Sequence, residues 1–345
     1  MGGSIKPCCA LRWNRGRRFG ALPAGKRSEC QKSLRRIPFL ATKGTGDMKR
    51  TQSIVKFGAS ALLAAGGLAL AAQQPASEHF ALRNNAAVAP QSALARFTSH
   101  NSVMATMQPS MITPLAAPDP RLVQYEKLSF SNSYTATGTQ TVNYGNARGG
   151  GIVAFNRVEV DVIPPAYIQH NSSADDGFGD MSVMGKVRIA SGNAEHGNYV
   201  VAAMLSHNFA TGSAKNGALT DAFCPTLVGG LGFKRRFDTI TSLGGVMPTG
   251  KIAAQGRTIA WNELMQMHAT RQVWLEVENN ATFYFAGSHD GKTQNFVTPA
   301  AFYVMRRKEW KPTHPFLIFD TGMQIATSGF HTYNHNLISE MRILF

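Results

Sequence analysis

The clearest pattern along the chain is an alternation of apolar and polar side chains that begins near residue 121 and recurs to the C-terminus. In residues 157–162 three valines alternate with three charged residues, and residues 180–189 and 272–278 repeat the pattern. Successive side chains of a β-strand point to opposite faces, so each stretch predicts a strand with one apolar and one charged face. Gly, Asn, Asp and Pro separate the stretches, which is typical of all-β proteins.

About twelve antiparallel strands can be placed in this way, and we expect an even number because both ends of a secreted barrel should lie in the periplasm. The expected strands are near residues 122–131, 137–145, 153–166, 180–190, 198–210, 225–236, 239–248, 257–267, 271–286, 295–305, 315–326 and 335–345. Their connections are expected outside the cell at 175–177, 211–223, 248–255, 287–293 and 329–335, with shorter periplasmic turns at 191–197, 237–238 and 268–270 and a longer one at 306–312.

The N-terminal third predicts a secreted precursor. Residues 48–71 hold a charged start (Met48, Lys49, Arg50), an apolar run of small residues and a small-x-small ending at Ala71, which together predict a signal peptide. Residues 1–47 are interpreted as upstream sequence from a wrong start, and a basic targeting arm is the alternative. Residues 72–120 show no sustained period and predict a flexible periplasmic lead-in, followed by the barrel over 121–345.

Alternation alone does not separate a membrane barrel from a soluble sandwich, whose apolar faces turn inward. The signal peptide favours the membrane, and so does the last strand, which ends on Phe345 with Leu337, Met341 and Ile343 at alternate positions. This ending is similar to the assembly signal of outer-membrane barrels. We therefore expect a transmembrane β-barrel in the bacterial outer membrane, with outer-membrane lipids and the barrel-assembly machinery as partners and a monomer as the favoured state.

In such a barrel the charged faces belong in the lumen, because a basic residue facing lipid at the midplane costs about 2–4 kcal/mol. A register slip of one residue would turn a whole row of charges toward lipid. The lumen-facing candidates carry both signs, which does not imply strong ion selectivity. They are Arg157, Glu159, Asp161, Lys186, Arg188, Glu276, Glu278, Asp320, Glu340 and Arg342.

Charge and cysteine content change little in this interpretation. The formal charge of +15 comes mainly from the first 71 residues, because the rest holds 21 basic and 18 acidic residues. The electrostatic argument for nucleic acid therefore disappears. Cys224 is the only cysteine after residue 30, so the barrel has no internal disulfide. No cofactor or metal motif is found, and the His331–His335 spacing is unremarkable in a strand or loop.

The sequence from Arg157 to Phe345 resembles the meta-pathway phenol-degradation proteins, a family of outer-membrane barrels described as transporters. The resemblance rests on residues 157–160, on 177–180 followed by 186–188, and on 248–250, with weaker support from 274–279 and the Phe ending. It implies transport of small, often aromatic, compounds.

The expected function is thus a channel or transporter for small solutes, with hydrophobic or aromatic compounds as candidates. A structural or adhesive barrel with a plugged lumen is the first alternative. An outer-membrane lipid hydrolase is the second, with His207 beside Ser206, or His335 with Ser339, as the pairs that could supply a base and a nucleophile.

Overall fold

The computed structural model describes residues 103–345 except 146–147, 214–215, 234–235 and 306–315. The predictions for 1–47, for the signal peptide at 48–71 and for residues 72–102 lie outside the described residues. The chain divides into two units, Met1–Ser53 and Ile54–Phe345, and every described residue belongs to the second. No helix of the described part is long and apolar enough to cross a membrane.

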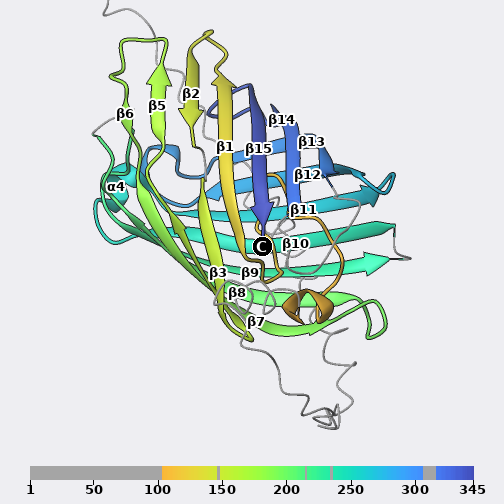
Figure 1. Cartoon of the computed structure of the whole chain (residues 1–345). Helices are drawn as coiled ribbons and strands as arrows, with labels where there is room; N and C mark the ends of the chain where they lie inside the picture. The colour runs from red at the N-terminus through yellow and green to blue at the C-terminus, as the bar shows by residue number, and fades with distance from the viewer. Residues whose placement is uncertain (1–102, 146–147, 214–215, 234–235, 306–315) are drawn as a thin grey trace, which may run out of the picture. The chain divides into compact units, whose positions relative to one another are not determined.

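The described chain is a single antiparallel sheet that closes on itself, because the last strand pairs with the first along its whole length, from Tyr125 opposite Leu344 to Tyr134 opposite His335 (Figure 1). Three long strands are interrupted and count as two pieces each, so the closed ring has twelve strands, as predicted. The pieces are β1 (Tyr125–Tyr134), β2 (Gln140–Tyr144) with β3 (Gly149–Phe155), β4 (Val158–Ile163) with β5 (Tyr167–His170), β6 (Gly177–Phe178) with β7 (Met181–Gly192), β8 (Tyr199–Phe209), β9 (Ala222–Phe233), β10 (Phe237–Pro248), β11 (Thr258–His268), β12 (Val273–Tyr284), β13 (Thr293–Met305), β14 (Phe316–Ala326) and β15 (His335–Leu344).

The second and third strands differ from the prediction. Residues 149–151 are three glycines that were expected in a loop, but they form the start of β3 between β1 and β4. A Cβ on Gly151 would collide with the Asp161 carboxylate and with the Tyr125 ring, so only glycine allows the strands to pack with these side chains between them. The third strand starts at Val158, and Pro164 and Pro165 interrupt it because proline cannot donate to the ladder.

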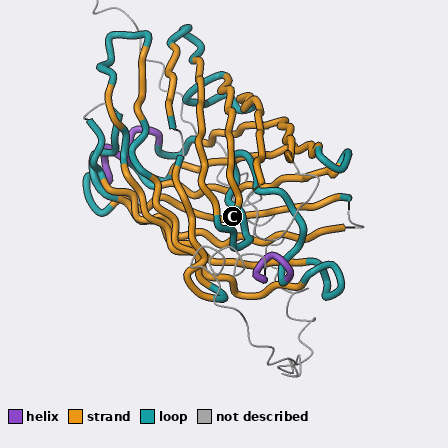
Figure 2. Tube along the Cα trace, in the orientation of Figure 1, coloured by secondary structure: helices purple, strands orange, loops and turns teal. Residues whose placement is uncertain are grey.

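The two ends of the barrel carry different connections (Figure 2). The terminal end, defined by Tyr125 and Leu344, has the short turns, and the expected turn at 237–238 lies instead between Phe233 and Phe237. The longer connection predicted there at 306–312 lies outside the described residues. The opposite end, which we call the outer end, has the longer connections. They include residues 210–221, a short helix α4 (Ile252–Gln255) and a 3-10 turn η3 (Gly287–His289).

The two faces of the wall have opposite chemistry. Outward positions expose large apolar side chains along the strands, such as Leu128, Val187, Leu243 and Val277, whereas inward positions bury most of the charged residues. The exposed rings of Tyr144, Tyr167 and Phe178 are in contact on neighbouring strands of the outward face. An apolar exterior around a polar interior is the surface of a barrel that crosses the bacterial outer membrane.

Candidate functional site

Nine of the ten predicted lumen residues are buried on the interior side of the wall. They are Glu159, Asp161, Lys186, Arg188, Glu276, Glu278, Asp320, Glu340 and Arg342. Arg157 differs, because it lies exposed in the two-residue turn between β3 and β4. The alternating run that begins at Arg157 starts in the turn rather than in the strand, so its first residue is not part of the wall.

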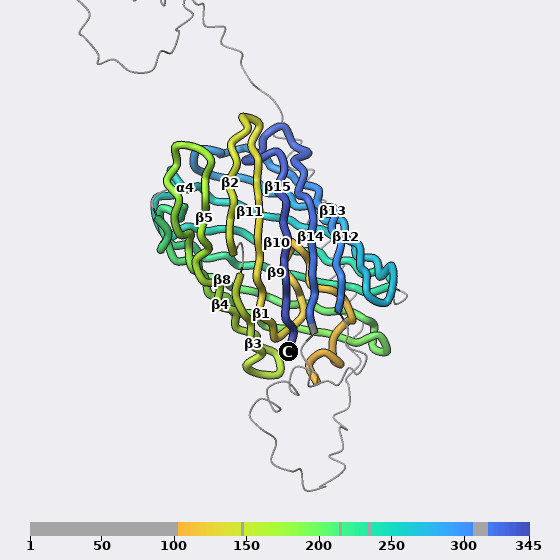
Figure 3. The backbone as a smooth tube through the Cα atoms, turned by 45° about the horizontal axis from the view of Figure 1, so that its top comes forward, coloured from red at the N-terminus to blue at the C-terminus, as the bar shows by residue number. Residues whose placement is uncertain are grey.

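The interior also holds a piece of chain that the sequence did not predict there. Residues 103–124, which we call the lumen segment, begin with a helical turn at 103–106 and then run without regular structure until β1 begins. Figure 3 shows this segment in orange at the end of the barrel where the C-terminus lies. Part of it was expected to be a flexible lead-in, whereas residues 111–123 contact the wall.

Wall carboxylates accept hydrogen bonds from the backbone of the lumen segment. Glu276 Oε1 accepts from the Leu115 N–H at 3.1 Å and Glu278 Oε1 from the Ala116 N–H at 2.9 Å. On the other side of the barrel, Glu159 Oε2 accepts from the Val123 N–H at 2.6 Å. Buried backbone groups must be paired, and an irregular segment cannot pair its own. The charged wall therefore supplies partners that secondary structure would supply elsewhere.

Wall cations complete the same pattern by donating to carbonyl oxygens. Arg342 donates to Thr113 O at 2.7 Å and to Pro114 O at 2.8 Å, and Lys186 donates to Arg121 O at 2.9 Å. The Gln266 amide bonds both the N–H and the carbonyl of Ile112, at 3.3 and 2.8 Å. Donors and acceptors thus alternate around the segment and fix its position in the lumen.

The segment is also braced internally by Arg121. Its guanidinium pairs with Asp119 at 2.7 Å, donates to the Thr113 hydroxyl at 2.9 Å and reaches the carbonyl of Met111. Burial alone would raise the pKa of Asp119, but the adjacent Arg121 guanidinium outweighs it and lowers the pKa to about 2. The brace therefore stays ionised at neutral pH and holds the segment in a compact turn.

Two apolar clusters hold the remaining surface of the segment. Met111 and Ala117 pack against a group of buried residues on β8–β11, namely Val200, Ala202, Met204, Val228, Ile240 and Leu264. Ile112 and Leu115 pack against a second group on β12–β15, namely Trp274, Phe302, Val304, Ile318, Ile338 and Leu344. Both clusters lie inside the barrel, so the lumen is filled by the segment at this level.

The wall charges also pair with one another. Arg342 contacts Glu340 at 2.6 Å and Asp320 at 3.2 Å, and Lys127, which the sequence analysis did not single out, contacts Glu340 at 3.5 Å. Lys186 pairs with Glu159 at 2.5 Å, directly across β4 and β7. Lys127 lies at an inward position of β1, two residues after Tyr125. The alternation of side chains in β1 could therefore have identified it as a lumen residue.

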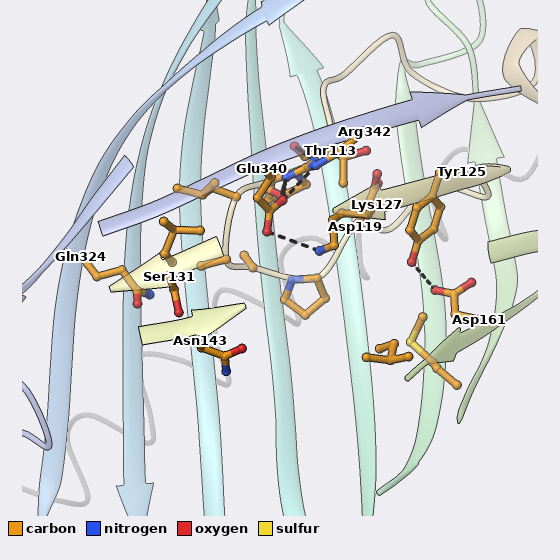
Figure 4. A pocket seen from close by; sticks show the side chains of 18 of the residues that line it. Thr113, Asp119, Tyr125, Lys127, Ser131, Asn143, Asp161, Gln324, Glu340 and Arg342 are labelled. Atoms are coloured by element: carbon orange, nitrogen blue, oxygen red, sulfur yellow. Dashed lines mark hydrogen bonds and ion pairs between the residues drawn. The ribbon is translucent and has the colours of Figure 1, made fainter. Parts of the chain in front are cut away.

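A cavity of about 530 Å³ lies between the lumen segment and the wall (Figure 4). Residues 113–119 of the segment border it on one side, together with the charged residues Lys127, Glu340 and Arg342. Toward the outer end its lining consists of uncharged polar side chains, which are Ser131, Ser133, Thr141, Asn143, Gln324, Tyr333 and Asn336. The cavity is thus the open part of a lumen that the segment fills at the terminal end.

Neither pair considered for hydrolysis comes together. His207 lies on the outward face of β8, where it stacks on Phe223, whereas Ser206 is the adjacent residue and points to the opposite face. His335 stacks on Tyr134, and the Ser339 hydroxyl bonds Thr321 instead. His331 bonds the Ser328 carbonyl and Asn334 in the connection between β14 and β15.

The last strand places the predicted assembly residues on one face. Leu337, Met341 and Ile343 alternate on β15 with the buried inward residues, and Phe345 follows directly after the strand. These residues therefore face the lipid side of the wall. Their part in assembly stays a prediction.

No family model and no curated protein matches this chain. It is similar to solved structures of an outer-membrane channel from Pseudomonas putida F1, with 10% identity over 68% of this chain and 100% of that chain at a TM-score of 0.47. The NanC porin has 7% identity over 63% and 98% of the two chains, with a TM-score of 0.42. The channel DcaP of Acinetobacter baumannii has 9% identity over 65% and 96%, with a TM-score of 0.31. The membership in the phenol-degradation family stays a prediction.

Proposed function

We propose that this chain forms an outer-membrane channel for small solutes, whose lumen the segment 103–124 narrows at the terminal end. The observation that carries the proposal is the cavity of about 530 Å³ inside a closed barrel, whose lining combines charged and polar side chains with apolar ones. Twelve strands are more than the eight whose interior is filled by side chains and fewer than those of wide porins, which favours a narrow passage.

The lining of the cavity suggests the size and character of the solute. Its volume lies within the range of about 300–1,000 Å³ that is typical of small-molecule sites. Apolar side chains such as Pro114, Ile163, Met184 and Ile338 share the lining with the polar ones. A small solute with an apolar part and a polar group fits this mixture, and aromatic compounds are among the solutes that do.

A structural barrel with a plugged lumen is the second candidate, and the lumen segment is the observation that favours it. Its hydrogen bonds to Glu159, Lys186, Glu276, Glu278 and Arg342 bind it to both sides of the wall. If the segment never moved and left no continuous path, the barrel would carry no flux.

Single-channel recording in planar bilayers, together with solute flux into liposomes, separates the two candidates. We expect the purified, processed protein to give small, discrete conductance steps. A closed baseline at all voltages, with no flux of small solutes, would instead support the plugged barrel.

A variant that lacks residues 103–119 should conduct several-fold more than the full chain, because the segment fills the lumen. A milder variant, Leu115→Ala, removes a side chain of the segment that packs against β12–β15 and should loosen the segment without removing it. Equal conductance in the full chain and in both variants would show that the segment does not limit the passage. Heat-modifiable gel mobility serves as the check that each variant has folded.

A further inference from the structure

The interior of the barrel carries more acidic than basic residues. Among the buried residues of the described chain, seven are acidic and three are basic. The sequence showed that both signs are present, whereas the structure shows how they pair. An excess of carboxylates in a narrow lumen attracts cations and repels anions.

At the cavity itself the excess is located at one residue. Four acids and three bases line it. Asp119 pairs with Arg121 and Glu159 with Lys186, while Glu340 and Asp320 share Lys127 and Arg342. Arg121 and Asp320 lie behind the lining, and these four acids and four bases balance. Asp161 is the acid of this lining that forms no ion pair with any described residue, and its contact is the Tyr125 hydroxyl at 2.8 Å (Figure 4).

The cavity also has hydrogen-bond acceptors that the described protein groups leave unpaired. Asp161 Oδ1, Asn143 Oδ1 and Asn336 Oδ1 are buried and lack a partner, and all three residues line the cavity. Asp161 is 1% exposed and Asn336 is 7% exposed. Among the fully buried atoms of the described lining residues, no donor lacks a partner. A ligand that completes the hydrogen bonds of these three oxygens must therefore carry donors.

The position of Asp161 is held by its surroundings. Gly151 lies directly opposite Asp161 on β3, and a Cβ there would collide with the Oδ1 atom. Tyr125 lies opposite the same glycine on β1 and holds the second carboxylate oxygen. Glycine at this position thus leaves room for the carboxylate, and the tyrosine fixes it with one oxygen unpaired beside the cavity.

We propose that the cavity binds a small organic cation that carries N–H donors, with Asp161 as its counter-ion and Asn143 and Asn336 as further acceptors. The inference rests on the proposed channel function and adds a solute class to it. An ammonium group supplies a positive charge to pair with Asp161. It also supplies N–H donors for the three unpaired oxygens. The apolar part of the lining accommodates a short hydrocarbon chain.

The test uses two isomeric cations, n-butylammonium and tetramethylammonium, which have the same charge and mass but differ in their N–H donors. Reversal potentials in a KCl gradient first give the ratio of K⁺ to Cl⁻ permeability, and bi-ionic recordings then compare the two organic cations. We expect a preference for K⁺ over Cl⁻ and for n-butylammonium over its isomer.

Asp161→Asn should lower the cation preference by about fivefold, the Boltzmann weight of one charge pair at 4 Å in water. It should also reduce the difference between the isomers, while Asn143 and Asn336 still accept from N–H groups. The matched control is Glu263→Gln, which makes the same chemical change on the outward face of β11 and should change neither ratio. Heat-modifiable mobility shows that both variants are folded.

Anion preference in the native protein, equal behaviour of the isomers, or unchanged selectivity in Asp161→Asn would each overturn the inference. If the native protein does not conduct, the proposed channel function fails, and calorimetric titration of the detergent-solubilised protein with n-butylammonium decides the site separately. Binding that Asp161→Asn abolishes and Glu263→Gln retains would support the site. Absence of binding would overturn it.

Discussion

The inward and outward faces of the wall are built from the same strands, but the inward face carries many charged residues and the outward face very few. In the described ring strands eleven Asp, Glu, Lys and Arg residues point inward, whereas Glu126 and Glu263 point outward. Glu126 lies near the terminal end of β1, but Glu263 lies in the middle of β11, between Trp261 and Met265. Most of the inward charges have partners from the wall or from the lumen segment, and no such contact is found for Glu263 in the described part. A charge in this wall is therefore stabilising only where the interior supplies a partner.

The largest effect is expected from Arg342→Met on the inward face. The change leaves Asp320 and Glu340 buried beside each other without the cation that they share, and it removes the donors to Thr113 and Pro114. We expect a loss of about 3–5 kcal/mol in the free energy of unfolding. Denaturant titration in lipid vesicles, followed by tryptophan fluorescence, measures it, with Arg342→Lys as the control. A loss below 1 kcal/mol would contradict the partner requirement.

A charge added to the outward face should cost slightly less. Val277→Arg places a basic side chain near the middle of β12, at a position that is 53% exposed on the lipid side. The expected loss is about 2–4 kcal/mol in the same unfolding assay, because arginine at the midplane loses its hydration. Val277→Leu is the matched control. An unchanged unfolding curve for the arginine variant would show that this face does not contact hydrocarbon.

Glu278→Ala should act on the lumen segment rather than on the whole barrel. The Ala116 N–H and the Asn280 amide both lose their acceptor, and an unpaired buried donor costs about 1–3 kcal/mol. We expect trypsin to cleave after Arg121 about tenfold faster, since 1.4 kcal/mol corresponds to a factor of ten. Glu278→Gln, which keeps an acceptor oxygen, should stay close to the native rate. Equal rates for all three proteins would exclude the role given to Glu278.

Glu263→Leu should have the smallest effect and the opposite sign. Removing an unpartnered carboxylate from the lipid face should leave stability unchanged or raise it by about 1 kcal/mol, since acidic residues cost less than basic ones there. The same unfolding assay applies, with Glu263→Gln for comparison. A clear loss of stability would mean that Glu263 has a partner in the membrane, and the contrast between the faces would need revision.

Alternation was enough to predict the ring, its twelve strands and its closure, because period two is a local property of each strand. The errors arise where local signals mislead. Residues 149–151 resemble a loop by composition, but their glycines serve close packing against Tyr125 and Asp161. Arg157 continues an alternating run while belonging to the turn before it.

The lumen segment could not be predicted because its order comes from distant residues. Its partners Glu276 and Arg342 lie more than 150 positions away along the chain. Within the segment no hydrophobic period exists, since it forms neither helix nor strand over most of its length. The cavity and the unpaired oxygen of Asp161 depend on this packing, so they were equally invisible in the sequence.

The separation of these partners has a consequence for biogenesis. The part of the wall that binds the lumen segment includes β15, which is synthesised last. The segment leads directly into β1, and the ring closes when β15 pairs with β1. While the ring is still open, Arg342 cannot donate to Thr113, so the binding site of the segment is incomplete. Docking of the segment and closure of the seam between the first and last strands must therefore be late, coupled events in the maturation of this barrel.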